Sequence, residues 1–375
     1  MRKHIIYRYF LFLSLVGLMQ LTFSCSSSSN EIEPLKPEGE DTPLEKDEYT
    51  FMNVEYRKWQ NGTFQAWTTA DSRETRTIDN MNWYTPSSDY SRTAWGGRIG
   101  LQPSSVVGKE GFFRVANCGG RSYLLDPDNG AVIIHGIQHV RPGESTAHKK
   151  AFGTRYGSEA RWSEETGKLL ADNHINYISY GSNRIEVFPA AVRGNLLTPK
   201  TQKIAYAENL YLLRTFMWDM SKNLGYAFDD DKYNRLVLLF EPTFATYIDR
   251  LVQEKSALFA GDRHFIGFYL DNELPFASYQ GTGYANTEGG GWLVHTQKNR
   301  GEFYQNFCLR LLETRNCVGW VHFEYNDGYD SNGKASNKGV VSIEYEPYES
   351  FLSQMRQLNL SVHSLIDYYD IKSVQ

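Results

Sequence analysis

The sequence is poor in cysteine and carries no excess of positive charge. It has four cysteines among 375 residues, and Cys118, Cys308 and Cys317 follow Cys25 at wide spacings with no CxxC pair. Three dispersed cysteines support neither a disulfide framework nor a zinc site. The formal net charge is -5 at pH 7, which offers no basic field to a nucleic-acid backbone. We therefore expect no nucleic-acid partner.

Phosphate-binding, nucleophile and metal motifs are also missing. The sequence contains no Gly-rich phosphate loop, no zinc-ligand spacing and no nucleophile elbow. In the loop around residue 330, Asp and Asn are spaced like the ligands of a calcium-binding loop. Glycine stands at the first and twelfth positions of that register, Gly328 and Gly339, which excludes an EF-hand. We therefore expect neither a cofactor nor a bound metal.

The composition is that of a globular protein with many aromatic side chains. Hydrophobic residues make up 41% of the chain and aromatic residues 14%. A chain of this length buries a large core and fits one domain of catalytic size plus appendages. Aromatic rings suit sugars, whose apolar C–H faces pack against them, but rings fill protein cores just as often. Neutral ligands are the expected class.

The first 48 residues have the pattern of an export signal and a tether. Residues 1–24 begin with basic side chains and continue in an apolar stretch that Arg8 interrupts short of a membrane span. Residues 21–25, Leu-Thr-Phe-Ser-Cys, resemble a relaxed bacterial lipobox, in which Cys25 is lipidated. The polar segment 25–48 is a flexible tether. We expect a lipid anchor in the outer membrane of a bacterial envelope, on its periplasmic or surface face, as the only membrane contact. Ordinary signal cleavage is the alternative.

The rest of the chain divides near residue 108. Residues 49–108 have weak periodicity and predict short strands and loops, either a β-rich appendage or a leader across the domain surface. Residues 109–368 alternate strand and helix patterns, as in an α/β domain. The expected strands are 112–116, 122–125, 131–135, 175–180, 265–270 and 318–325, the expected helices are 157–172, 242–254, 296–313 and 347–357, and 205–223 is a helix or a strand with a helix.

The strongest local signal is the stretch from Phe265 to Pro275. Its aromatic-rich apolar run ends in Asp271-Asn272-Glu273, which indicates a buried parallel strand with polar groups at its carboxyl end. That end is where α/β barrels hold their chemistry. An acid at a partly desolvated strand end suits proton donation near neutral pH, and an Asn can both donate to and accept from a sugar hydroxyl. A plain helix cap is the alternative reading.

Residues 271–276 resemble the fourth-strand motif of the retaining glycoside hydrolases of the TIM-barrel clan, in the variant of the β-agarases of glycoside hydrolase family fifty. Residues 111–142 resemble that family's entry into the barrel and its first strand, and residues 319–325 with 337–339 resemble its eighth strand and following loop. The likeness covers about residues 110–368. It implies a (β/α)8 TIM-barrel fold and hydrolysis of β-linked galactose-containing polysaccharide or oligosaccharide. Asn272 would bind a hydroxyl and Glu273 would be the general acid/base.

The chain is too short for the whole of that barrel. Only about 45 residues, many of them glycine, separate Glu273 from Val318, whereas one strand with its helix takes roughly 25 to 30 residues. The segment for strands five to seven is therefore missing, and we expect an incomplete barrel of strands one to four and eight. The last strand should pair with the first, and 281–292 should cross the open side without forming a strand. An incomplete gene product is a further explanation of the gap.

The missing segment includes the family's nucleophilic Glu. Retaining hydrolysis needs two carboxylates about 5 to 5.5 Å apart, and Glu288 and Glu324 are the substitutes that the sequence offers. Glu324 is the better placed, because Trp320, His322 and Glu324 alternate on one face of the last strand. A satisfied polar residue at a strand end is the alternative for Glu324.

Several further residues are expected to line the pocket. Asp271 precedes the Asn-Glu pair, and His135, His139 and Arg141 flank the end of the first strand. We expect Asp271, His139, Arg141, Trp320 and His322 to bind substrate. The alternatives are core roles, which are common for a single Trp or His. Two functions stay open: an exported glycoside hydrolase, or a catalytically inactive relative that binds carbohydrate on aromatic surfaces.

Overall fold

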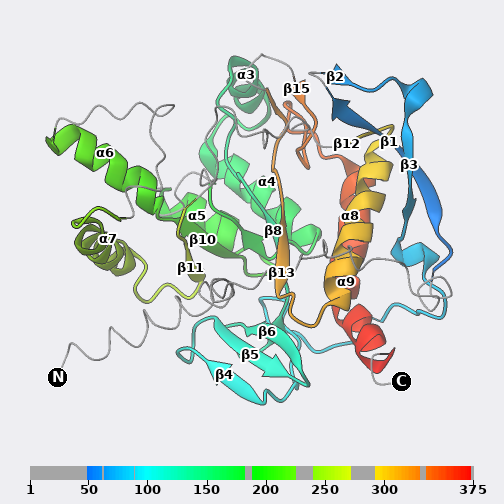
Figure 1. Ribbon diagram of the computed structural model, residues 1–375, viewed down its shortest axis with the longest axis horizontal. Helices are drawn as coiled ribbons and strands as arrows, with labels where there is room; N and C mark the ends of the chain where they lie inside the picture. Colours follow the sequence, from blue (N-terminus) through cyan, green and yellow to red (C-terminus); the bar gives the residue numbers. More distant parts are fainter. Residues whose placement is uncertain are drawn as a thin grey trace, which may run out of the picture. The chain divides into compact units, whose positions relative to one another are not determined.

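A computed structural model describes residues 49–60, 63–87, 89–181, 188–224, 240–271, 292–329 and 335–372 (Figure 1). All of them belong to one compact unit, residues 46–375. Cys25, Asn272, Glu273 and Glu288 lie outside the described residues, so the predictions made for them remain predictions.

The core of the fold is a five-stranded sheet in the order β11-β10-β9-β8-β13, in which every neighbouring pair is parallel. The strands are β8 (Ile134–Ile137), β9 (Tyr177–Ile178), β10 (Ala205–Asn209), β11 (Phe265–Tyr269) and β13 (Gly319–His322). The predicted pairing of the last strand with the first is confirmed, because β13 lies beside β8. Within the described residues, β11 and β13 are the edges of this sheet.

The β8–β13 pairing extends beyond the two strands. It begins where Ile134 N–H donates to the Val318 carbonyl and continues to Tyr325 N–H, which donates to the Gln138 carbonyl. Gly136 allows β8 to pack closely between β9 and β13, because a Cβ at this position would collide with the Tyr177 ring and the Val321 side chain. The two chain segments therefore leave the sheet side by side at its carboxyl edge.

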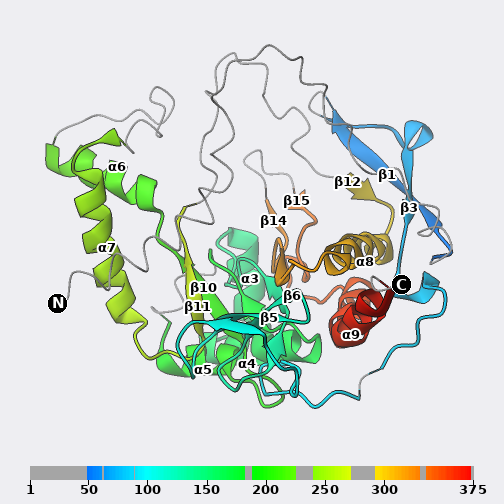
Figure 2. The same cartoon turned by 60° about the horizontal axis from the view of Figure 1, so that its bottom comes forward.

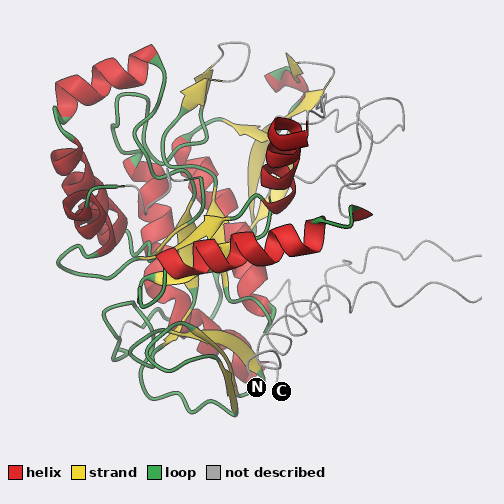
Figure 3. Ribbon diagram, turned by 90° about the vertical axis from the view of Figure 1, so that its left-hand side faces the viewer, coloured by secondary structure: helices red, strands yellow, loops and turns green. Residues whose placement is uncertain are grey.

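Seven α-helices accompany this sheet in the described residues (red in Figure 3). They are α3 (Thr146–Arg155), α4 (Glu159–Asp172), α5 (Ala190–Leu197), α6 (Leu212–Leu224), α7 (Phe244–Leu258), α8 (Gln297–Glu313) and α9 (Glu349–Lys372). Helices α4 and α5 pack on the sheet, whereas α6 packs on α7. The hydroxyls of Ser145, Ser158 and Thr296 accept from backbone N–H groups in the first turns of α3, α4 and α8, which satisfies donors that would otherwise be unpaired. The mixed α/β class is thus confirmed.

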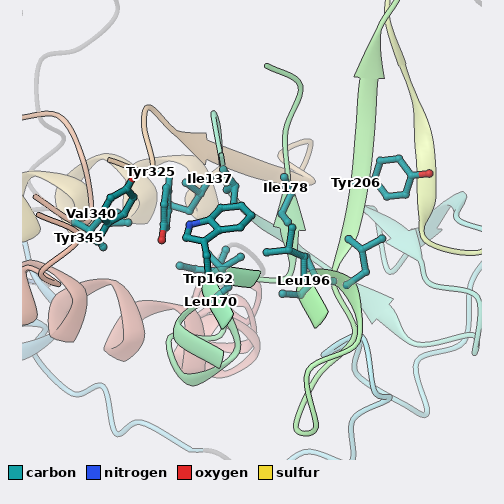
Figure 4. Close-up of a cluster of buried hydrophobic side chains, with 14 of the residues drawn as sticks. Ile137, Trp162, Leu170, Ile178, Leu196, Tyr206, Tyr325, Val340 and Tyr345 are labelled. Atoms are coloured by element: carbon teal, nitrogen blue, oxygen red, sulfur yellow. The ribbon is translucent and has the colours of Figure 1, made fainter. Parts of the chain in front are cut away.

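The main core lies between this sheet and helices α4 and α5. Trp162 of α4 and Leu196 of α5 are buried against Ile137, Ile178 and Tyr206, which come from three successive strands (Figure 4). Tyr206 and Ile178 face the helices, whereas their neighbours Ala205 and Tyr177 face the opposite side of the sheet. This alternation separates a helix-facing layer from an inner layer, as expected for a sheet covered on both faces.

A small antiparallel sheet leads into the parallel one. It consists of β4 (Ser105–Val107), β5 (Arg114–Cys118), β6 (Arg121–Leu125) and β7 (Ala131–Val132), and it matches the predicted hairpin. Arg121 is fully buried and donates to Asp370 of α9 and to the carbonyls of Leu312 and Thr314. The Arg121 guanidinium therefore connects this sheet by hydrogen bonds to the ends of α8 and α9. These two helices lie side by side (Figure 2).

The first described strands form a further antiparallel sheet. β1 (Met52–Gln60) pairs with β2 (Thr63–Phe64), β3 (Asp71–Thr75) and β12 (Trp292–Val294). The expectation of no strand across 281–292 is wrong at Trp292, which begins β12. Trp292 pairs with Lys58 and stacks on Tyr56 at 4.1 Å between ring centroids. Such a pairing between distant segments leaves no local sequence signal.

One helix end differs from the sequence-based expectation, and one open alternative is decided. Helix α9 runs to Lys372 rather than to residue 357, because its later turns bury Leu358, Val362 and Leu365 against α8 and the small sheet. The 205–223 segment is resolved in favour of a strand with a helix, β10 and α6. The short hairpin β14 (Gly328–Tyr329) and β15 (Ala335–Ser336) follows β13.

Two histidines are buried between the parallel sheet and α9. His135 of β8 is 4% exposed and His363 of α9 is 1% exposed. Burial lowers the pKa of His135 to about 3 and that of His363 to about 4. Nearby Arg92 lowers both further. Both rings are therefore neutral in the folded protein well below the ordinary histidine pKa.

We predict that acid destabilises the protein through these two rings. In the unfolded chain their pKa lies near 6.5, so below that pH the unfolded chain binds protons that the folded protein does not. The free energy of unfolding is therefore full above pH 6.5 and falls as the pH drops toward 4. Each should remove up to about 2 kcal/mol of unfolding free energy between pH 7 and pH 5. Urea unfolding at both pH values measures this. His363→Gln should shrink the difference, and His295→Gln, at a half-exposed ring, should not. An undiminished difference in His363→Gln would refute the assignment.

Candidate functional site

Polar side chains and one glycine follow the parallel strands at their carboxyl edge. They are His139 after β8, Gly181 after β9, Asn209 and Tyr211 at the end of β10, Asp271 after β11, and Glu324 after β13. Parallel strands place their carboxyl ends at one edge, where α/β enzymes assemble their active sites. This edge is therefore the candidate functional site.

His139 and Glu324 form a hydrogen-bonded pair at this edge. Nδ1 of His139 donates to Oε2 of Glu324 at 2.9 Å, and the two side chains are 25% and 16% exposed. The pair follows directly from the β8–β13 pairing, since each residue lies two positions beyond its strand. With Nδ1 engaged, Nε2 is the remaining ring nitrogen, and its edge of the ring lies against Gly181.

The His139 ring is held by packing as well as by Glu324. His139 has a left-handed backbone, with φ of 56°. Its ring packs directly over Gly181, where any Cβ would collide with it, and the edge of Phe323 lies 5.0 Å away between centroids. These contacts and the hydrogen bond to Glu324 together hold the imidazole in its observed orientation.

A cavity of about 290 Å³ lies at the ends of β10 and β11 beside α7, and neither His139 nor Glu324 lines it. Gly181 lines the cavity on one side and supports the His139 ring on the other. Its walls combine charged, amide and aromatic side chains, contributed by Arg141, Glu208, Asn209, Tyr211, Lys255, Phe259 and Phe268 among others. A volume near the lower end of ligand pockets has room for about one sugar unit.

Trp320 and His322 do not share a face with Glu324. Nε1 of Trp320 donates to the Tyr304 hydroxyl at 2.6 Å, and Nε2 of His322 donates to the Lys338 carbonyl at 2.9 Å with its ring beside Phe351. Both side chains pack in the helix layer around α8 and α9. The predicted alternation fails because β13 ends at His322, so Glu324 lies beyond the strand and turns to His139.

His135 is likewise not at the pocket mouth. It is buried in the helix-facing layer, where its ring lies 5.0 Å from that of Trp320 and Nδ1 donates to the His174 carbonyl. The reason is strand direction: His135 is near the start of β8, whereas the site is at its end. These positions are those of core residues.

Asp271 and Arg141 lie at the expected edge. Oδ2 of Asp271 accepts from the backbone N–H of Leu213 at 2.8 Å, so its carboxylate caps the start of α6. Arg141 lines the cavity and pairs with Glu144. The structure thus brings Arg141, His139 and Glu324 to one region, while Asn272 and Glu273 follow Asp271 in the sequence outside the described residues.

Sequence reasoning overlooked Gly181, Asn209 and Tyr211. All three lie at or just beyond the ends of β9 and β10. The inner layer also contains Tyr269, whose hydroxyl accepts from Tyr177 at 3.2 Å. Assigning the end of each parallel strand, rather than of one, would have found the first three. For Asn209 and Tyr211 that signal was hidden because residues 205–223 were not divided into strand and helix, whereas Gly181 directly follows the expected strand 175–180.

The described part of the chain contains no group of three or more His, Cys, Asp or Glu side chains that could hold a metal ion. No helix among these residues has the length and apolar character needed to span a membrane.

Comparison with known proteins identifies the fold. No protein-family model matches the sequence, and no curated protein does. The solved structure of BpGH50 superposes with a TM-score of 0.69 at 18% identity, covering 86% of this chain and 96% of BpGH50. The agarase AgWH50C gives 0.45 at 13% identity, covering 75% and 67% of the two chains. At these identities only the fold of BpGH50 is shown to be shared, and a missing segment is not confirmed.

We predict that Gly181→Ala will disturb the His139–Glu324 pair. Gly181 has φ of 79° and no room for a Cβ, so alanine should cost about 1–2 kcal/mol and displace the imidazole. Urea unfolding and the NMR signals of the His139 ring measure the two effects. Gly194→Ala is the control, because this α5 glycine has open space around it. Unchanged ring signals in Gly181→Ala would contradict this description of the site.

Proposed function

We propose that the protein is a glycoside hydrolase of agarase-like type that cleaves β-linked galactose-containing polysaccharide or oligosaccharide. The observation that carries the proposal is the carboxyl edge of the parallel sheet. There His139 and Glu324 meet, and β11 leads through Asp271 into Asn272 and Glu273 in the sequence. The fold shared with BpGH50 supports a barrel-type hydrolase, and the motif supports the agarase branch.

In this proposal Glu273 is the general acid/base and Asn272 binds a sugar hydroxyl. Glu273 would give its proton to the glycosidic oxygen as the bond to the anomeric carbon breaks, and would then take a proton from water in the second step. Glu324 is the second carboxylate, which would attack the anomeric carbon as that bond breaks and form the glycosyl-enzyme that water then cleaves. Its hydrogen bond from His139 disperses negative charge on one oxygen and leaves the other for the reacting sugar.

The second candidate is a glycan-binding protein without hydrolytic activity. The observation that favours it is the same hydrogen bond, since a carboxylate engaged by imidazole is a weaker nucleophile than an unpaired one. Arg141 and the aromatic cavity wall would then hold sugar without cleaving it. The two candidates differ in one outcome, the appearance of new reducing ends.

We predict that Glu273→Gln will lower kcat/KM on an agar-derived oligosaccharide by about 100-fold or more, the usual share of a general acid. The loss should be much smaller on 4-nitrophenyl β-galactoside, because nitrophenolate leaves with little help from a proton. Reducing-end and nitrophenol assays on the full chain measure both. Glu254→Gln is the control, since this carboxylate is on the surface of α7.

Equal rates for Glu273→Gln and the unchanged protein would refute the assigned acid/base. Binding of the oligosaccharide without any release of reducing ends would establish the second candidate. Glu324→Gln tests whether Glu324 acts as the second carboxylate. The glutamine amide oxygen can still accept the hydrogen bond from His139, but the negative charge is lost.

We also propose that the protein is exported and anchored through a lipid on Cys25, in the outer membrane of a bacterial cell envelope. The support is the signal-like segment 1–24 and the residues that precede Cys25. One acyl chain binds a membrane only marginally, so several chains on this cysteine would be needed for stable anchoring.

Cys25→Ala should therefore release the protein from the membrane fraction without affecting hydrolysis. Fractionation of cells that express each form, followed by immunoblotting, measures the distribution. Retention of Cys25→Ala in the membrane fraction would show that the lipid anchor is wrong.

A further inference from the structure

We infer that Arg300 of α8 is a positioning residue for the His139–Glu324 pair, on which it acts through the chain segment 337–340. This segment directly follows β15. In the proposed reaction Glu324 attacks the anomeric carbon, so the orientation of its carboxylate sets the rate. The effect on hydrolysis therefore rests on the proposed function, whereas the effect on the geometry of the pair does not.

Segment 337–340 is hydrogen-bonded to the backbone of Glu324. The N–H of Glu324 donates to the Lys338 carbonyl at 3.3 Å, and the N–H of Val340 donates to the Glu324 carbonyl at 3.2 Å and to the Tyr325 carbonyl at 2.8 Å. The N–H of Tyr325 in turn donates to the Gln138 carbonyl, just beyond β8. The backbone around Glu324 is therefore held both by the end of β8 and by segment 337–340.

The same segment is connected to His139 through side-chain packing. Nζ of Lys338 lies 5.6 Å from the centroid of the Phe323 ring, where a cation is attracted to the aromatic face. The Phe323 ring in turn meets the His139 ring edge-on, at 5.0 Å between centroids. A displacement of Lys338 would therefore be felt by both members of the pair, by Glu324 through its backbone and by His139 through Phe323.

Arg300 holds three successive residues of this segment. Its Nη2 donates to the carbonyls of Lys338 and Gly339, each at 2.9 Å, and its Nη1 donates to Oδ1 of Asn337 at 3.3 Å. The guanidinium carbon lies 4.4 Å from the centroid of the Phe351 ring of α9, which fixes the plane of the group. Only a planar, multiply donating guanidinium can bind all of these acceptors at once.

Asp327 binds the donor groups of the same segment. Its Oδ1 accepts from the N–H of Gly339 at 2.8 Å, and its Oδ2 accepts from the Asn337 amide at 2.9 Å and from the Tyr348 hydroxyl at 2.6 Å. Burial lowers the pKa of Arg300 to about 10, although the charge of Asp327 raises it, so the guanidinium is charged at neutral pH. A cation on the carbonyls and an anion on the N–H groups make strong hydrogen bonds to one short segment.

Arg300→Met is the most direct test, because Met keeps an unbranched apolar side chain and removes every donor. On an agar-derived oligosaccharide kcat should fall about 10-fold with KM nearly unchanged, since the variant misorients the nucleophile and leaves sugar binding intact. The Nδ1–H proton of His139, followed by NMR, should exchange with water about 10-fold faster, because its hydrogen bond to Glu324 is less well held. The second measurement does not depend on hydrolysis.

Two further variants and one reference signal keep the result interpretable. Arg300→Lys keeps the charge but cannot bind all three acceptors, so it should restore only part of both losses; it also replaces Arg300→Met if that variant does not fold. Arg310→Met is the matched control, because Arg310 is an exposed arginine of the same helix, paired with Glu313 at 3.0 Å. It should change neither quantity. The ring of His264, whose Nδ1 donates to the Ile204 carbonyl at 2.8 Å, should exchange at the same rate in every variant.

In a protein that cleaves the oligosaccharide, both a lower kcat and faster exchange at His139 are required. The absence of either change in both Arg300 variants would overturn the inference and leave the hydrolase proposal in place. Equally faster exchange at His139 and His264 would also overturn it, because it would show a general loss of structure. If the unchanged protein cleaves no oligosaccharide, the proposed function fails, and the exchange rates alone decide whether Arg300 positions the pair.

Discussion

The parallel pairing of β8 with β13 is the constraint on which the rest of the site depends. These strands are far apart in sequence, and their ladder runs from Ile134 and Val318 to Gln138 and Tyr325. It sets His139 and Glu324 beside each other two residues beyond their strands. Gly136 permits the close packing of neighbouring strands, and Gly181 then leaves space for the imidazole. A shift of β13 by one residue along β8 would turn the side chains of β13 to the other face and separate Glu324 from His139.

The helix layer keeps this register from slipping. Ile137 and Trp320 project outward into separate buried clusters, one under α4 and α5 and one under α8 and α9. Arg121 links the ends of α8 and α9 to the small sheet that leads into β8. The first and last strands of the parallel sheet are thus held by elements from both ends of the described chain. This explains why polar groups at the carboxyl edge can have fixed orientations.

The sequence predicted those features that depend on local pattern. Apolar runs at 131–135, 265–270 and 318–325 predicted the strands β8, β11 and β13, together with the pairing of the last strand with the first. The expected burial of 265–270 is wrong, because β11 is an edge strand whose residues are only partly buried. Trp320 and His322 were wrongly expected to line the pocket. Alternation along a strand shows that two residues share a face of the sheet, but it does not show whether that face packs against the helices or against the inner layer. Strand β12 was missed because its pairing with β1 joins distant segments. Asn209 was missed because the sequence did not show that β10 ends there.

We propose that this carboxyl edge performs retaining hydrolysis of a β-galactoside. Proton NMR of the first products from an agar-derived oligosaccharide tests it most directly, because the anomeric signals report stereochemistry before mutarotation. The account predicts that the β-anomer appears first, as two successive displacements require. Initial release of the α-anomer would contradict the retaining mechanism, and the absence of any new anomeric signal would contradict hydrolysis itself.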